Sequence, residues 1–353
     1  MKKYFLAPFA LMMSAVWAYP PPPADPKLPP TSVEPAVQQL RRAMLDADVN
    51  SLMFHNMDQL FTTRLVGRSG PVWQLPRMDH VLDFNYTFEG KTYTPEQFVQ
   101  RTYTNALLIM KDGHIVYETY RNNTNESTRF IAFSMTKSIT SLLVGIALGE
   151  HRIESLDDPI TKYLPELASG AYNRVTLRQI LQMRSGVDYE ERYDFGNPGI
   201  AALNHEHSLV ENVTRFADAA RTIKRKDVPG TVWQYKTLDT AVLGWLLERV
   251  SGGSTVAAYT AQRLWEPLGA EANAFYIMDG APGTGREFSG AGFNATLRDF
   301  ARIGQMVLNG GTANGQRSLS QIRDELRNAG WGGGSDQDAV ATYRRLSDAA
   351  TGH

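Results

Sequence analysis

The chain has 353 residues, with 36 lysines and arginines, 37 aspartates and glutamates, no cysteine and a formal net charge of −1. This length allows one large domain or two smaller ones. Balanced charge without a basic patch argues against binding to nucleic acid. The lack of cysteine excludes disulfides, thiolate catalysis and cysteine-ligated metals.

The N-terminus is predicted to be a signal peptide, residues 1–18. Lys2 and Lys3 form a basic start, residues 4–16 are apolar, and Ala18 ends a small-residue cleavage site. The apolar stretch is too short to span a bilayer comfortably. We therefore expect a periplasmic or secreted bacterial protein without stable membrane insertion, the alternative being an uncleaved membrane anchor. A proline-rich linker is expected at residues 19–35.

The main domain is predicted to cover residues 36–317, followed by an atypical, truncated or frameshifted tail at 318–353. Two β-rich runs around a Lys-Asp-Gly turn predict a hairpin, residues 106–110 and 114–120. Residues 55–76 give no clear pattern, and no β-rich run is expected after residue 278. Hydrophobic spacing and caps predict the remaining elements: helices at 37–48, 139–149, 176–183, 209–225, 238–250, 255–264 and 296–309, and strands at 232–235 and 274–278.

A serine and a lysine lie one turn apart at the head of the predicted helix that ends near Gly149. Ser134 and Lys137 form the S-x-x-K motif of acylating serine enzymes. A serine hydroxyl is a weak nucleophile until a base takes its proton. A lysine can be that base when burial and neighbours lower its pKa from ~10.4, and the apolar flank at residues 130–133 favours this. The alternative is a helix-capping serine followed by a solvated lysine.

A second proton-transfer group is needed to protonate the leaving atom. Tyr235 is the best candidate, because it ends the β-like run 232–235 just before a helix, and a nearby ammonium group lowers a tyrosine pKa from ~10. A core tyrosine is the alternative. The polar segment 188–207 is either an active-site loop or plain surface, and we expect its Tyr189 to contact the substrate.

Other patterns give weaker predictions. His205, Glu206 and His207 have the spacing of metal ligands on a strand, but no third ligand is evident, so a polar loop is favoured. The glycine-rich residues 280–292 lack the lysine of a phosphate-binding loop. No G-x-S-x-G elbow occurs, which argues against the α/β-hydrolase route. We expect neither a metal nor a cofactor.

Several segments, in matching order over residues 105–316, resemble the serine hydrolases of the class C β-lactamase and penicillin-binding-protein superfamily. The resemblance is strongest to the branch of 6-aminohexanoate-dimer hydrolase and related carboxylesterases. The segments are FSMTKS at 133–138, DPITKYLPEL at 158–167, LQMRSGV at 181–187, YKTLDTAVLG at 235–244, AGFNATLRDFARIG at 291–304 and, for that branch, HNMDQLF at 55–61.

The resemblance implies an α/β (α+β) fold, in which an antiparallel sheet is flanked by helices and an all-helical lobe is inserted at about residues 150–270. The sheet is expected to combine the hairpin near Ala106 with C-terminal strands. Ser134 would be the acylated nucleophile, Lys137 its proton partner and Tyr235 the general acid/base. Thr237 stands where β-lactamases have asparagine, which favours the esterase and amidase branch, and is expected to contact substrate.

The implied activity is hydrolysis of a small-molecule ester or amide, such as an aminohexanoate oligomer or a small carboxylic ester. The family's third element, a Lys/His-Thr/Ser-Gly strand that adds an oxyanion donor, has no equivalent; residues 350–353 carry similar letters without a strand around them. We therefore expect the last strands to be missing. The alternatives are an inactive relative or acyl-ligand-binding protein, and a β-lactamase or D-amino-acid peptidase.

Overall fold

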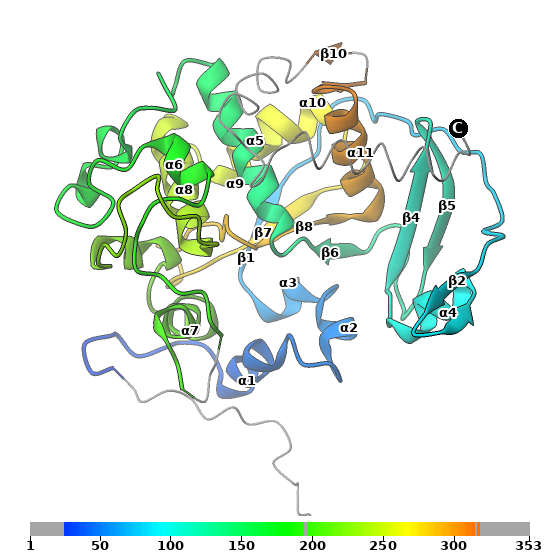
Figure 1. Ribbon diagram of the computed structural model, residues 1–353, viewed down its shortest axis with the longest axis horizontal. Helices are drawn as coiled ribbons and strands as arrows, with labels where there is room; N and C mark the ends of the chain where they lie inside the picture. Colours follow the sequence, from blue (N-terminus) through cyan, green and yellow to red (C-terminus); the bar gives the residue numbers. More distant parts are fainter. Residues whose placement is uncertain (1–24, 194–196, 315, 318–353) are drawn as a thin grey trace, which may run out of the picture.

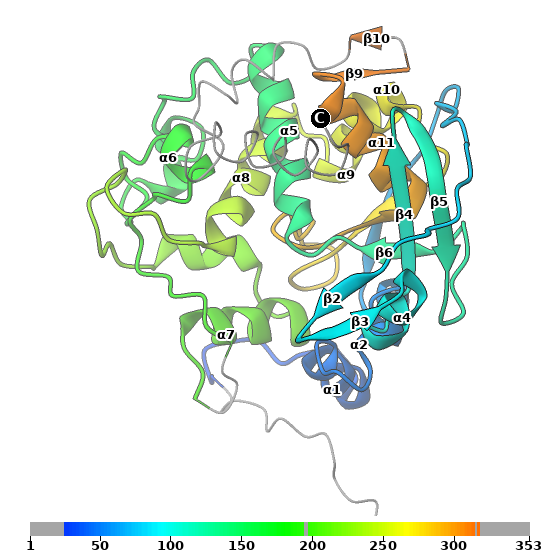
Figure 2. The same cartoon turned by 45° about the vertical axis from the view of Figure 1, so that its right-hand side comes forward.

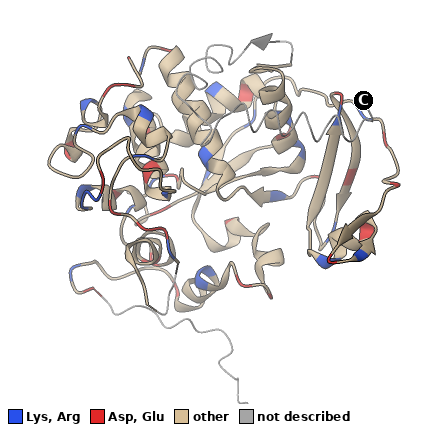
Figure 3. Cartoon of the chain, in the orientation of Figure 1, with Lys and Arg blue, Asp and Glu red and all other residues tan. Residues whose placement is uncertain are grey.

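The structure, a computed structural model, describes residues 25–193, 197–314 and 316–317. The predicted signal peptide and the predicted tail lie outside the described residues. No helix within the described ranges is both long and apolar enough to cross a membrane. Lysines and arginines, and aspartates and glutamates, are scattered over the described part of the chain (Figure 3).

A four-stranded antiparallel sheet in the order β1-β7-β8-β6 forms the centre of the molecule (Figure 1). In the described part of the chain, three two-stranded ladders lie outside it, namely β2–β3, β4–β5 and β9–β10. The strands are β1 Thr63–Val66, β2 Tyr86–Phe88, β3 Lys91–Tyr93, β4 Ala106–Lys111, β5 His114–Tyr120, β6 Arg129–Ile131, β7 Ala274–Ile277, β8 Phe293–Thr296, β9 Thr312–Ala313 and β10 Gln316–Arg317.

Helices cover this sheet and make up most of the region between β6 and β7 (Figures 1 and 2). The α-helices are α1 Pro35–Ala43, α2 Asn50–Met53, α3 Met57–Leu60, α4 Pro95–Arg101, α5 Met135–Gly149, α6 Leu177–Leu181, α7 Ile200–His205, α8 Thr237–Val250, α9 Val256–Thr260, α10 Glu266–Leu268 and α11 Leu297–Leu308. Short 3-10 turns are η1 Ile160–Lys162, η2 Pro165–Leu167 and η4 Phe216–Arg221, and π-helical turns are η3 Glu206–Val210 and η5 Ala261–Trp265.

One face of the central sheet packs into the hydrophobic core, and the other face lines a pocket. Tyr276 and Phe293 are paired across β7 and β8 and are fully buried, with the Phe293 ring packed edge-on against Trp265 at 5.4 Å. Strand neighbours alternate between faces, so Ile131 and Ile277 point to the other side. Both line the pocket described below. One face therefore holds the core, and the other holds the pocket.

The predicted antiparallel sheet flanked by helices and the helical insertion are confirmed. Helix α5 packs beside α8, and its Leu143, Val144 and Ala147 have no exposed surface. Helices α6 and α11 begin at Thr176 and Thr296, whose side chains accept hydrogen bonds from the backbone three residues on, as capping residues do.

The predicted composition of the sheet was wrong within the described residues. Strands β4 and β5 do form the expected hairpin, but within the described residues they pair with each other and, through β5, with residues 76–80 rather than with the central sheet. The sheet beside α5 is built instead from β6, β8, β7 and β1. Strand β8 was missed because a four-residue strand buried on both faces carries no period-2 pattern. Strand β1, which is largely exposed, lies in the segment 55–76 that gave no clear pattern.

Two further predictions were wrong. Residues 232–235 form no strand, although their composition is β-like. The segment 209–225, expected to be one helix, contains only the end of η3 and the 3-10 turn η4, because the Asn212 backbone is left-handed, with φ at 53°. A residue in that conformation ends a helix.

Candidate active site

Ser134 lies at the N-terminal end of α5, directly after a strained residue. Phe133 has a φ of 42°, a conformation that bulky side chains rarely adopt. Its ring packs edge-on against Phe54 at 4.9 Å, and Ala132 N–H bonds to the Phe293 carbonyl at 2.8 Å. These contacts hold the turn, which leaves Ser134 exposed at the surface of the pocket.

The structure brings Ser134, Lys137 and Tyr235 together. Tyr235 Oη donates to Ser134 Oγ at 2.6 Å, although the two residues are 101 positions apart. Lys137 Nζ donates to the same oxygen at 3.2 Å. The Lys137 ammonium also lies 4.9 Å from the centre of the Tyr235 ring. One hydroxyl oxygen therefore contacts both proton-transfer candidates.

A backbone carbonyl fixes the lysine. Lys137 Nζ donates to the Gly290 carbonyl at 2.9 Å. Gly290 lies in the segment that connects β7 to β8. A Cβ at this position would lie 2.5 Å from Thr237 Cγ2, so glycine allows the segment to pack against the start of α8. Lys137 is half-buried rather than enclosed by apolar groups as the sequence indicated, because this polar contact and the open pocket surround its ammonium.

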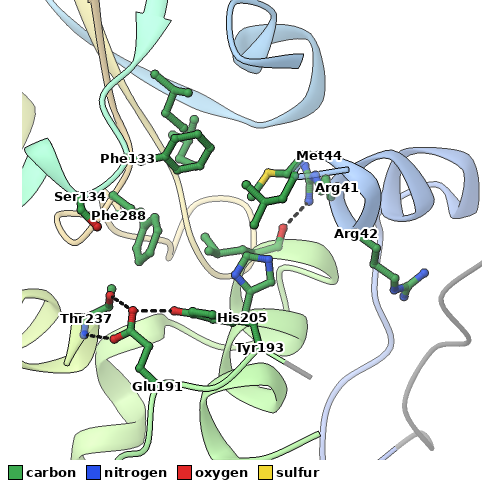
Figure 4. Close-up of a pocket in the computed structure, with 15 residues that line it drawn as sticks. Arg41, Arg42, Met44, Phe133, Ser134, Glu191, Tyr193, His205, Thr237 and Phe288 are labelled. Atoms are coloured by element: carbon green, nitrogen blue, oxygen red, sulfur yellow. Dashed lines mark hydrogen bonds between the residues drawn. The ribbon is translucent and has the colours of Figure 1, made fainter. Parts of the chain in front are cut away.

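A largely apolar pocket of about 140 Å³ begins at Ser134. In Figure 4 it runs from Ser134 and Thr237 on one side to Met44 and Arg41 on the other. Its apolar lining includes Phe133, Leu209 and Phe288. Clefts of this kind, apolar with a few convergent polar groups, are typical of small-molecule sites.

One carboxylate, that of Glu191, lines this pocket. Glu191 accepts hydrogen bonds from the Thr237 backbone N–H at 2.5 Å and from Thr237 Oγ1 at 2.7 Å (Figure 4). Tyr193 Oη donates to the same carboxylate at 3.1 Å. All three donors are neutral, and no ion pair to Glu191 occurs among the described residues. Thr237 thus lines the pocket as expected, with its hydroxyl engaged by Glu191.

Tyr189 is not brought to the pocket. Its side chain has no exposed surface, and its hydroxyl accepts a hydrogen bond from Asn204 at 3.4 Å. Glu191 and Tyr193, two and four residues further on, line the pocket instead. The polar segment around residue 190 indicated the right loop. Because the loop has no regular period, the sequence could not show which of its side chains face the core and which face the pocket.

Buried polar groups support the start of α8 beneath Tyr235. Asp239 is fully buried and accepts a hydrogen bond from Tyr172 Oη at 2.7 Å. Burial raises the pKa of Asp239 to about 6. Lys236, only 1 % exposed, donates to the Gln234 carbonyl at 3.3 Å, and burial lowers its pKa. This network has no recognisable pattern in the sequence.

The far end of the pocket is held by two buried arginines of α1. Arg41 donates to the carbonyls of Leu60, Leu209 and Val210 and to Asn212 Oδ1. Burial lowers the pKa of Arg41 to about 10, which leaves it charged at neutral pH. Arg42 forms an ion pair with Glu206, and both side chains are buried. The sequence placed no functional residue here.

The His-Glu-His segment is helical rather than a polar loop. Glu206 pairs with Arg42, while His207 Nδ1 lies 2.9 Å from Glu211. His205 lines the pocket and packs edge-on against the Tyr193 ring at 5.8 Å. No group of three metal-ligating side chains occurs in the described part of the chain.

Related sequences point in the same direction as this geometry. The chain is 34% identical over 231 residues to 6-aminohexanoate-dimer hydrolase of Paenarthrobacter ureafaciens, and this match covers 64% of the chain but only 57% of that enzyme. Beta-lactamase-like protein 2 of Dictyostelium discoideum is 26% identical over 150 residues, 41% of this chain and 26% of that protein.

Solved structures share the fold. A Bacillus anthracis protein with the provisional name 6-aminohexanoate-dimer hydrolase superposes with a TM-score of 0.71 at 26% identity, covering 82% of this chain and 76% of that one. A Bacteroides dorei protein provisionally called a β-lactamase has a TM-score of 0.52 at 20% identity, covering 69% and 71%; this likeness concerns the fold alone. Residues 96–352 match the Beta-lactamase family, and the chain belongs to that family of hydrolases.

Proposed function

We propose that the protein is a serine hydrolase that cleaves a small ester or amide through an acyl-enzyme on Ser134. The observation that carries the proposal is the meeting of Lys137 Nζ and Tyr235 Oη at Ser134 Oγ, at 3.2 Å and 2.6 Å. Both distances allow direct proton transfer. A helix-capping serine needs neither contact, and the Ser134 side chain makes no capping hydrogen bond.

In the proposed reaction, Lys137 or Tyr235 in its deprotonated form takes the Ser134 proton. The Ser134 oxygen attacks the substrate carbonyl, and Tyr235 returns the proton to the leaving oxygen or nitrogen as that bond breaks. Water then attacks the acyl-enzyme by the reverse proton path and releases the acid. Because Lys137 Nζ and Tyr235 Oη both contact Ser134 Oγ, the two side chains act as one proton-transfer unit.

The developing oxyanion needs fixed donors. The Ser134 backbone N–H makes no hydrogen bond within the described residues and is thereby free to donate. We assign it as one oxyanion donor. A second donor is not assigned among the described residues, and this keeps a binding protein without turnover as the competing function.

A fluorophosphonate probe separates the hydrolase from the binding protein. We expect one covalent adduct on Ser134, located by peptide mass spectrometry, because only an activated serine attacks phosphorus at a useful rate. The matched control is Ser138→Ala, which removes a hydroxyl one turn along the same helix and should label normally. Folded wild-type protein without an adduct on Ser134 would rule out the hydrolase.

For the substrate, we propose an amide or ester that carries an ammonium group, as an aminohexanoate oligomer does. Glu191 supports this, since its carboxylate lies in the pocket and, among the described residues, is held by neutral donors. A charged group in a partly dry pocket attracts an opposite charge and repels a like one. The name of the Paenarthrobacter ureafaciens relative points to the same chemistry.

The isosteric change Glu191→Gln tests this substrate class. We expect kcat/KM for p-nitrophenyl 6-aminohexanoate to fall by about tenfold, equal to 1.4 kcal/mol, while p-nitrophenyl hexanoate is unaffected or improved. Glu190→Gln, one residue earlier, is the control. Equal losses on both esters would assign Glu191 a purely structural role at Thr237.

A further inference from the structure

The far wall of the pocket comes from a part of the chain that precedes the family match. Arg41, Arg42, Met44 and Leu45 line the pocket, whereas the match to the Beta-lactamase family begins at residue 96. The Ser134 end is thus built from the family domain and the opposite end from α1. Figure 4 shows both ends in one view.

We infer that α1 and the two residues after Ala43 determine substrate specificity, by limiting the length of the acyl chain that the pocket accepts. The inference rests on the proposed function and adds the element that selects the substrate. The acyl chain is the part that stays on Ser134 while the leaving group departs, so a pocket that ends at a wall suits the acyl side.

The wall is anchored strongly enough to act as a fixed stop. Arg41 Nε and Nη1 bond to four acceptors, at 2.7 Å for Leu60 O, 2.9 Å and 3.0 Å for Leu209 O and Val210 O, and 2.5 Å for Asn212 Oδ1. The Arg42–Glu206 pair adds a second anchor to the same π-helical turn, η3. Charged hydrogen bonds of this type are about twice as strong as neutral ones.

The size and chemistry of the space indicate what fits. A cavity of about 150 Å³ with an aliphatic and aromatic lining holds one benzene molecule, and this pocket has about 140 Å³. Met44, 5 % exposed, lies at the far end, and Phe288, 6 % exposed, lies nearer to Ser134. An acyl chain of about six carbon atoms therefore fills the space, and longer chains meet α1.

Resizing Met44 tests the stop directly. Met44→Trp fills the far end, so kcat/KM for p-nitrophenyl hexanoate should fall by at least about tenfold relative to p-nitrophenyl acetate. Met44→Ala should raise the octanoate-to-acetate ratio by a similar factor. Leu40→Ala, on α1 but absent from the pocket lining, is the matched control and should leave both ratios unchanged. A merely structural role for Met44 would change all acyl lengths by the same factor, which would overturn the inference.

A binding measurement separates this inference from the proposed function. In Ser134→Ala protein, hexanamide titrated by calorimetry should bind at least about tenfold more weakly when Met44→Trp is added. If wild-type protein hydrolyses no ester but hexanamide binding responds in this way, the hydrolase is wrong and the wall is right. If esters are hydrolysed and neither binding nor the chain-length ratios change, the wall is wrong.

Discussion

The two ends of the pocket differ in backbone strain and in how completely their buried charged groups are hydrogen-bonded. At the Ser134 end, Phe133 has a left-handed backbone, Lys137 is half-buried, and the buried Asp239 has an oxygen without a hydrogen-bond partner. At the α1 end, the buried charges of Arg41, Arg42 and Glu206 are fully engaged. The first end thus combines strained backbone with an incompletely hydrogen-bonded buried carboxylate, whereas the buried charges at the second end are hydrogen-bonded or paired.

This difference is expected if chemistry takes place at one end only. Strained backbone and perturbed charges persist where the surrounding structure enforces them, and they gather at reactive sites. A wall that only shapes the pocket needs rigidity, which paired charges and carbonyl contacts supply. Changes at the Ser134 end should therefore alter activity more than stability, and changes at the α1 end should do the reverse.

The largest expected effect is that of Lys137→Ala on turnover. Removing a proton-transfer group costs about 10²–10⁴-fold in rate, so kcat for p-nitrophenyl acetate should fall by that factor while urea unfolding changes little. Lys137→Arg retains the positive charge but cannot give up a proton, and should be almost as inactive. Lys111→Ala, in the exposed hairpin turn, is the control. Full activity of Lys137→Arg would show that only the charge is needed.

The next effect concerns stability at the α1 end. Arg42→Met leaves the Glu206 carboxylate, 1 % exposed, without its partner, which should lower the free energy of unfolding by about 3–5 kcal/mol. Urea denaturation measures this. Adding Glu206→Leu removes the stranded charge and should restore most of the loss.

A surface ion pair provides the matched comparison for this change. Arg249 and Glu166 also pair, but their side chains are 43% and 31% exposed, so Arg249→Met should cost less than about 1 kcal/mol. If Arg42→Met cost no more than Arg249→Met, the α1 end would not be held by its buried charges, and the contrast between the two ends would disappear.

Sequence alone predicted the Ser134 end better than the α1 end. Ser134, Lys137 and Tyr235 are few, chemically distinctive and set in recognisable segments, so their meeting could be expected before any coordinates. Helix α5 and the capped helix at Thr296 were predicted because periodicity and caps are local signals. The two helices, unlike the meeting of Ser134 with Tyr235, depend on residues close together in the chain.

The remaining features depend on long-range contacts without a local signature. Arg42 and Glu206 are 164 residues apart, and nothing in either neighbourhood marks them as partners. Glu191 reaches the pocket while Tyr189 is buried, because tertiary packing sets the phase of an irregular loop. The short strand β8 was missed for the same reason, since its pairing with β6 and β7 defines it.

The smallest expected effect is on the pH dependence of stability. It comes from the buried Asp239 carboxylate, which lies near the Ser134 end of the pocket. Burial raises the pKa of Asp239 from 3.8 to about 6. Below pH 4 the Asp239 carboxyl group is neutral in both the folded and the unfolded state. Above pH 6 it is charged in both states, and the desolvation of the buried charge then destabilises the folded state. Stability from this group is therefore lost as pH rises from about 4 to 6. Asp239→Asn retains an acceptor for Tyr172 and does not titrate.

Relative to wild type, Asp239→Asn should become more stable by roughly 1–3 kcal/mol between pH 4 and pH 7, measured by urea unfolding across that range. The control has the opposite sign: the hydrogen bond from Arg178 lowers the pKa of the exposed Asp157, so Asp157→Asn should lose stability as pH rises, by less than about 0.5 kcal/mol because solvent screens the pair. If Asp239→Asn behaved like Asp157→Asn, the buried carboxylate would be stabilising, and the Ser134 end would be as well compensated as the α1 end.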